Sequence, residues 1–130
     1  MGVQVYWHDE DQRILVYSVT SPWNLEDLYD GLEQAGKLGE ETSPEYIIYD
    51  VTASDSLPQG FFSSLRLMQQ AYLNTINLRV LVGAQGVVKS VFGVIKRIAP
   101  NLTRTIVLAP TMETAVALIG THQSEDSAAD

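Results

Sequence analysis

The chain alternates between short β-rich apolar runs and longer segments in which apolar residues recur at helical spacing. Two β-rich runs, VQVYW (3–7) and RILVYSV (13–19), flank the polar cluster HDEDQ and predict an antiparallel hairpin. Three later apolar runs, EYIIYDV (45–51), NLRVLVG (77–83) and RTIVLA (104–109), predict further strands. EYIIYDV is apolar at nearly every position, which is typical of a strand buried on both faces of a sheet.

Four segments carry the 3.6-residue periodicity of amphipathic helices. Asn24 suits the N-cap of the first helix, and Gly39 is its natural stop. Thr111 suits the cap of the last helix, which we expect to end before Gly120. The predicted helices cover 21–38, 60–74, 87–100 and 110–120.

The resulting order, ββαβαβαβα, predicts a single α/β domain over residues 1–120, with a mixed five-stranded sheet and four helices. An N-terminal antiparallel hairpin leads into parallel strands joined by right-handed crossovers. If the strands are neighbours in sequence order, every helix lies on one face. The other face then needs a helix, a second subunit or an apolar ligand to cover it. The polar, acidic segment 121–130 predicts a disordered tail.

Composition supports a globular protein, because 45% of the 130 residues are hydrophobic and 18% are charged. No apolar run approaches the roughly 18 residues of a membrane span, and the N-terminus does not resemble a secretory signal. The chain has no cysteine, which excludes disulfides and thiolate chemistry and is compatible with a reducing compartment. We expect a cytoplasmic protein.

The net charge of −8 is unevenly distributed. Residues 1–60 contain 12 acidic and 2 basic residues, whereas 61–120 contain 6 basic and 1 acidic. Such asymmetry either steers a partner and aligns two copies, or reflects surface helices that happen to differ in charge. No dense basic stripe is interleaved with aromatic residues, so nucleic-acid binding is not expected.

Motifs for cofactors and catalysis are incomplete. GAQGVVKS (83–90) follows a predicted strand, but Val88 stands where a phosphate-binding loop needs glycine, so no nucleotide cofactor is expected. His8 and His122 lack neighbouring metal ligands, and we expect both to be solvated. There is no Gly-x-Ser-x-Gly elbow and no internal histidine to act as a base, so the sequence does not predict an enzyme.

Two regions are candidates for interaction. The apolar arc of the third helix is broad and rimmed by basic residues, so it either packs deeply or meets another protein or anionic lipid. Its candidate surface is Lys89, Phe92, Lys96 and Arg97. The connection YDVTASDSLPQG (49–60) is either a structural strand-to-helix turn or a regulatory loop. Its candidate residues are Asp50, Ser54, Asp55, Ser56, Leu57, Pro58, Gly60 and Phe61.

The element order, together with YIIYDVTASDSLPQGFFSSL (46–65) and RTIVLAPTMETAVALI (104–119), resembles the STAS domain family. This family includes anti-sigma factor antagonists of the SpoIIAA type and is related in fold to CRAL-TRIO lipid-binding domains. The antagonists carry Asp-Ser-Ser-Gly, and its first serine is phosphorylated. When Gly60 is matched to that glycine, Pro58 replaces the acceptor serine and Leu57 the aspartate. The resemblance therefore implies the fold without the usual phospho-acceptor.

The resulting functional prediction is a non-enzymatic STAS-like interaction module, forming a homodimer and binding a regulatory protein. The alternative is a small carrier that binds an apolar, lipid-like ligand between sheet and helices, as the CRAL-TRIO kinship implies. Ser54 and Ser56 lie near the matched position and remain candidates for modification.

Overall fold

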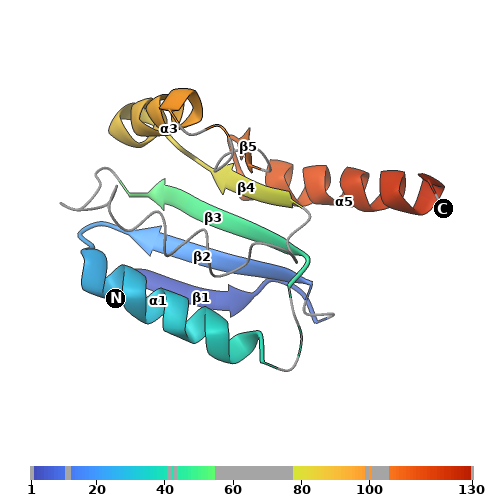
Figure 1. The fold of residues 1–130 in the computed structure, drawn as a ribbon, viewed down its shortest axis with the longest axis horizontal. Coiled ribbons are helices and arrows are strands. Elements are labelled where there is room, and N and C mark those ends of the chain that lie inside the picture. Colours follow the sequence, from blue (N-terminus) through green and yellow to red (C-terminus); the bar gives the residue numbers. More distant parts are fainter. Residues whose placement is uncertain are drawn as a thin grey trace.

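The computed structural model describes residues 2–10, 13–40, 42, 44–54, 78–98, 100 and 106–129. Its strands are β1 (Val3–Trp7), β2 (Ile14–Thr20), β3 (Tyr46–Ala53), β4 (Leu78–Val82) and β5 (Ile106–Ala109). Its helices are α1 (Leu25–Leu38), α3 (Gly86–Ile98) and α5 (Met112–Ala129) (Figure 1). The described residues therefore contain three helices, and the helix predicted over 60–74 lies outside them.

The five strands form one mixed sheet in the order β1-β2-β3-β4-β5. β1 and β2 pair antiparallel, and every later pair is parallel. This confirms the predicted hairpin and the parallel remainder of the sheet. The register aligns one row of side chains across four strands, in which Tyr17 faces Tyr49, Tyr49 faces Leu81 and Leu81 faces Leu108.

Each face of the sheet carries its own apolar core. On one face, Leu15 and Ile47 pack in a cluster with Ala35 of α1 and Val88 of α3. On the other face, a second cluster contains the following residues of β2–β5 and α5: Ile14, Val16, Tyr46, Ile48, Val80, Val82, Ala109, Ala115 and Ile119. Because neighbouring strand residues point to opposite faces, β3 needs apolar residues at consecutive positions, as its sequence predicts.

A helix, α5, covers the second face of the sheet, so the expectation that all helices share one face is wrong. The strand order follows the sequence, and α1 and α3 pack on the same face. α5 packs on the opposite face through Ala115 and Ile119. The rule of right-handed crossovers constrains helices that join two parallel strands. α5 follows β5 and does not connect two of the described strands, so this rule does not fix the face on which it packs.

The predicted ends of α1 are confirmed. The Asn24 side chain accepts a hydrogen bond from the Asp27 backbone N–H at 2.9 Å, and the Asp27 carboxylate accepts one from the Asn24 N–H at 3.0 Å. This reciprocal capping box satisfies two N–H groups that the first helical turn leaves unpaired. At the other end, the Gly39 N–H donates to the Ala35 carbonyl at 3.0 Å.

α5 begins as predicted but does not end as predicted. The Thr114 N–H donates to Thr111 Oγ1 at 3.1 Å, which confirms the cap. The helix then passes Gly120 and continues to Ala129, so residues 121–129 are helical rather than a disordered tail. Glycine weakens a helix by about 1 kcal/mol without necessarily ending it. Tertiary contacts of His122 supply a reason for the extra turns.

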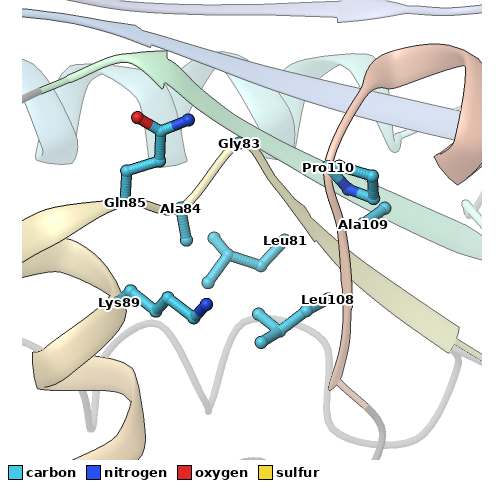
Figure 2. Close-up of a pocket in the computed structure, with 8 residues that line it drawn as sticks. All are labelled: Leu81, Gly83, Ala84, Gln85, Lys89, Leu108, Ala109 and Pro110. Atoms are coloured by element: carbon cyan, nitrogen blue, oxygen red, sulfur yellow. The ribbon is translucent and has the colours of Figure 1, made fainter.

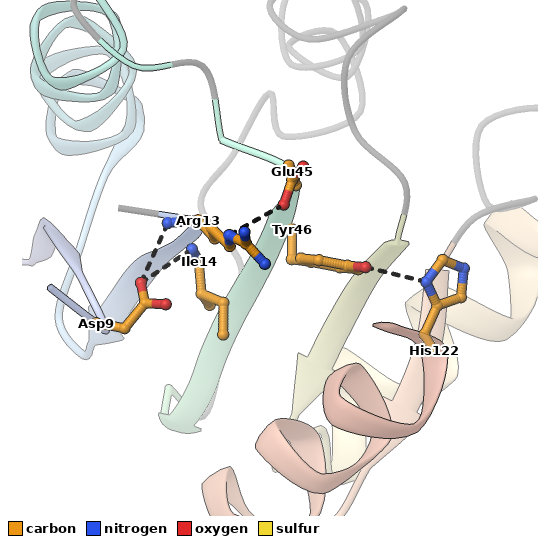
Figure 3. A network of polar contacts seen from close by, with 6 residues as sticks. All are labelled: Asp9, Arg13, Ile14, Glu45, Tyr46 and His122. Carbon is orange, nitrogen blue, oxygen red and sulfur yellow. Dashed lines mark hydrogen bonds and ion pairs between the residues drawn. The ribbon is translucent and has the colours of Figure 1, made fainter. Parts of the chain in front are cut away.

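His122 packs against the sheet and is not a solvated tail residue. Its Nδ1 lies 3.1 Å from the Tyr46 hydroxyl, and the two rings meet edge to face at 5.6 Å (Figure 3). Tyr46 belongs to β3 and is almost fully buried. The contact joins the C-terminal half of α5 to the centre of the sheet across 76 positions of sequence. Within the described ranges, no helix is both long and apolar enough to cross a membrane.

Candidate functional site

The carboxyl ends of the parallel strands meet along one border of the sheet, which we call the strand-end edge. It consists of the ends of β2–β5 and the residues that follow them. Neighbouring ends are joined directly, because the Ser21 N–H donates to the Ala53 carbonyl and the Gly83 N–H donates to the Ala109 carbonyl, each at 3.0 Å. In open α/β sheets, ligands bind outside the carboxyl ends of the strands where the strand order reverses, and the described strands run in sequence order without such a reversal.

The candidate loop 49–60 begins at the strand-end edge. The Asp50 carboxylate accepts a hydrogen bond from the Thr52 N–H at 3.1 Å, which stabilises the end of β3. Ser54 is 8% exposed, and its Oγ accepts a hydrogen bond from Trp23 Nε1 at 2.9 Å. This bond ties the segment before α1 to the end of β3. The remaining candidates lie outside the described residues: Asp55, Ser56, Leu57, Pro58, Gly60 and Phe61.

The second candidate surface lies on α3. Lys89, Lys96 and Arg97 are exposed, whereas Phe92 is partly buried. Val88 belongs to the core, and Val94 remains 44% exposed. The apolar arc of this helix is therefore divided between packing and exposure. No acidic residue occurs between Gly86 and Ile98, so the charged residues on the exposed face of α3 are all basic.

A cleft of about 350 Å³ lies between the end of β4, the start of α3 and the end of β5. We call it the β4–β5 cleft. Its lining is Leu81, Gly83, Ala84, Gln85, Lys89, Leu108, Ala109 and Pro110 (Figure 2). Figure 2 shows that the Leu81 and Leu108 side chains lie side by side and that the Lys89 ammonium reaches toward them. The Gln85 side chain points away from the two leucines.

Of the candidate residues that the structure describes, only Lys89 lines the cleft. Leu81, Leu108 and Pro110 were not predicted as site residues. The signal that could have found them is the position of GAQG and AP directly after two predicted parallel strands. Carboxyl ends of neighbouring parallel strands lie at the same edge, so these two connections had to come close together.

The GAQG connection is a structural turn. Gly83 has a φ of +73°, and a Cβ at this position would lie 2.9 Å from the Thr52 Cα. Glycine therefore allows the end of β4 to approach β3 closely. Val88, the residue that interrupts a phosphate-loop pattern, is buried in the core. The side chain that breaks the motif thus has a packing role.

Three tyrosines of β2 and β3 pack in or against the apolar clusters on the two faces of the sheet. Tyr17 and Tyr46 are almost fully buried, and Tyr49 is partly buried. The rings of Tyr17 and Tyr49 have centroids 5.3 Å apart on the α1 face. Burial raises the pKa of the Tyr49 hydroxyl above its ordinary value, and the Arg79 guanidinium opposes part of this rise. Tyr49 is therefore neutral at physiological pH.

Polar groups at the opposite end of the sheet serve the hairpin. The Asp9 carboxylate accepts hydrogen bonds from the N–H groups of Arg13 and Ile14 at 3.1 and 3.3 Å. The Arg13 guanidinium lies 3.7 Å from Glu45, just before β3 (Figure 3). Within the part of the chain that the structure describes, no group of three or more histidines and carboxylates is arranged to hold a metal ion.

Comparison with solved structures finds the Bacillus cell fate determinant SpoIIAA in its phosphorylated form. The alignment covers 90% of this chain and 98% of that one, with a TM-score of 0.64 and 10% sequence identity. The chain has the SpoIIAA fold. This confirms the resemblance to STAS domains at the level of architecture, and identity this low carries the fold alone. No protein-family model and no curated protein matches the sequence.

Proposed function

We propose that this protein is a non-enzymatic interaction module that binds a regulatory protein through the strand-end edge and the exposed face of α3. The observation that carries the proposal is the exposed basic surface of Lys89, Lys96 and Arg97, which contains no acidic residue. Exposed apolar side chains, Val94 and Leu108, lie on and beside this surface. An apolar patch with a charged rim is typical of protein-binding surfaces.

The polar groups described at the strand-end edge support a structural role in place of catalysis. Asp50 and Ser54 accept hydrogen bonds from Thr52 and Trp23 respectively. The Ser54 Oγ accepts a hydrogen bond from the Trp23 indole N–H, which ties the end of β3 to the segment before α1.

We further propose that binding is not controlled by phosphorylation of the position matched to the SpoIIAA-type serine. SpoIIAA was solved in a phosphorylated form, but Pro58 stands at the matched position of this chain and has no hydroxyl. Nearby Ser54 is nearly buried against Trp23. Phosphorylation there would place about two negative charges in a closed contact. A constitutive binding surface fits these residues better than a switch.

The test compares partners captured by the wild-type chain and by a variant carrying Lys96→Glu and Arg97→Glu. Chemical crosslinking in cell extract, followed by mass spectrometry, should identify one regulator that the wild type binds and the variant loses. Lys37→Glu is the matched control, because it reverses an exposed charge on α1. Identical partner sets for the wild type and the α3 variant would contradict the proposal.

We also propose that the module forms a homodimer. The outward face of α1 exposes Glu26, Asp30 and Glu33, whereas α3 exposes Lys96 and Arg97. Opposite charges on two surfaces of one chain favour contact between two copies at moderate ionic strength. Native mass spectrometry should give twice the chain mass, and a monomer across the micromolar range would contradict this part of the proposal.

The second candidate function is a small carrier, and the β4–β5 cleft is the observation that favours it. The cleft lies between sheet and helix and is lined mainly by apolar residues. Its volume of about 350 Å³ lies at the lower end of the range for small-molecule pockets. Solvent extraction of the purified protein should release a bound apolar compound, and an extract identical to a buffer blank would contradict the carrier function.

A further inference from the structure

We propose that the β4–β5 cleft binds a small apolar monocarboxylate, whose alkyl part lies on Leu81 and Leu108 and whose carboxylate pairs with the Lys89 ammonium. This inference rests on the second candidate function, the carrier, and names the chemistry of its ligand. It does not depend on the protein partner proposed for α3.

The apolar floor of the cleft comes from two strands in register. Leu81 and Leu108 are direct partners across β4 and β5 and therefore project from the same face of the sheet. Leu108 is 44% exposed on β5, which is an edge strand of the sheet, so its side chain is accessible to a ligand. Ala84 and Pro110 complete the lining at the carboxyl ends of these strands. An alkyl chain on this floor would remove leucine surface from water.

Among the described residues that line the cleft, one side chain is charged and none is acidic. Lys89 approaches the two leucines from α3 (Figure 2). Among the described residues, none forms an ion pair with Lys89. By contrast, Lys37 lies 3.9 Å from Glu33 on the acidic helix α1. A cation beside apolar surface is complementary to a ligand that is apolar along its body and anionic at its end.

The number of charged hydrogen-bond donors at the cleft indicates which type of anion it can bind. Phosphate groups are usually held by several donors, such as a bidentate arginine or a series of backbone N–H groups. Among the described lining residues Lys89 is the only charged donor, since the Gln85 amide points away from the two leucines, and one ammonium matches one carboxylate. At about 30 Å³ for an atom the size of water, a 350 Å³ cleft has room for on the order of ten non-hydrogen atoms. Octanoate is a probe of this size and chemistry.

The experiment titrates the full chain with octanoate and follows backbone amide resonances by NMR. Saturable shifts are expected at Leu81, Ala84 and Leu108, with a defined dissociation constant. Lys89→Met should weaken binding roughly two- to fivefold, the range expected for the loss of an ion pair to an exposed side chain. Lys96→Met is the matched control on the same helix outside the cleft, and it should bind octanoate as the wild type does.

Two further measurements separate the contributions of charge and apolar surface. Octanol should bind roughly two- to fivefold more weakly than octanoate, because it lacks the charge that pairs with the exposed Lys89. Leu108→Asp should abolish octanoate binding by placing a negative charge in the cleft. Leu108 is exposed, so this variant should retain the wild-type amide spectrum away from β5.

The inference is overturned if octanoate shifts residues remote from the cleft, if Lys89→Met binds as tightly as the wild type, or if octanol binds equally well. The carrier function fails separately, when solvent extraction releases nothing. If extraction yields a neutral lipid while octanoate does not bind, the carrier function stands and the carboxylate specificity is wrong.

Discussion

The two ends of the sheet differ in whether the side chains described there pair with other groups of the protein. At the hairpin end, Asp9 accepts two backbone N–H bonds, Arg13 pairs with Glu45, and Tyr46 contacts His122 (Figure 3). At the strand-end edge, Leu108 remains exposed and Lys89 has no ionic partner among the described residues. The first end uses its chemistry to hold the fold. The second leaves apolar surface and charge available to a partner or ligand.

The largest effect should come from the hairpin end, with Tyr46→Ala. Tyr46 is 2% exposed and lies in the core cluster beneath α5. Removing a buried aromatic ring typically costs about 3–5 kcal/mol, since it leaves a cavity as well as losing apolar burial. Urea unfolding should therefore show a large drop in midpoint. Leu108→Ala at the strand-end edge should cost under about 0.5 kcal/mol, in keeping with its exposure. Equal losses would remove the contrast between the two ends.

Gly83→Ala should have the next largest effect and would show that the strand-end edge also has a structural component. The positive φ of Gly83 and the closeness of Thr52 both oppose a Cβ. We expect a loss of about 1–3 kcal/mol in the free energy of unfolding. Gly86→Ala is the control, because Gly86 also has a positive φ but has open space around it. A larger loss of unfolding free energy for Gly83→Ala than for Gly86→Ala would support a structural role for the strand-end edge. The reverse order would contradict it.

His122→Ala should cost about 0.5–1.5 kcal/mol, the usual net value of one hydrogen bond. Its Nδ1 contacts the Tyr46 hydroxyl at 3.1 Å. Tyr46→Phe removes the same hydroxyl while keeping the ring, so a double-mutant cycle isolates the coupling between the two residues. Amide hydrogen exchange should accelerate in α5 beyond Gly120. Additive losses, with unchanged exchange, would mean that the contact does not stabilise the C-terminal turns.

The raised pKa of Tyr49 predicts a small effect on the free energy of unfolding that is confined to alkaline pH. Burial raises the pKa of its hydroxyl in the folded state, with Arg79 opposing part of the rise. Above the unfolded-state pKa of about 10, the unfolded chain loses this proton more readily than the folded chain. The free energy of unfolding should therefore fall as the pH rises through this range. Below it both states are protonated, so Tyr49 contributes no pH dependence.

The measurement is urea unfolding between pH 8 and 11 for the wild type and for Tyr49→Phe. The variant should lose part of the alkaline decline, because phenylalanine has no ionisable group. Tyr29→Phe is the control, since Tyr29 is exposed on α1. An alkaline decline of equal size in all three proteins would show that Tyr49 does not contribute.

Local signals in the sequence were sufficient where the structure depends on neighbouring residues. The residues of the capping box, Asn24 and Asp27, are three positions apart, and the hairpin needs only two β-rich runs around a polar turn. The consecutive apolar residues of β3 likewise indicated burial on both faces. Gly120 is the counterexample: a local stop signal was overridden by the contact between His122 and a strand far away in the sequence.

By itself, therefore, the sequence determined the five strands and the start signals of α1 and α5, because each follows from periodicity and capping over a few residues. The SpoIIAA-like fold was predicted from a resemblance to a known family, and the structural comparison confirmed it. Tertiary structure decided which face α5 covers, how far it extends and where the cleft forms. These features require side chains from distant segments to meet, as Leu81, Lys89 and Leu108 do at the ends of β4 and β5. Only the paired strands and the helix packed beside them bring those three side chains to one place.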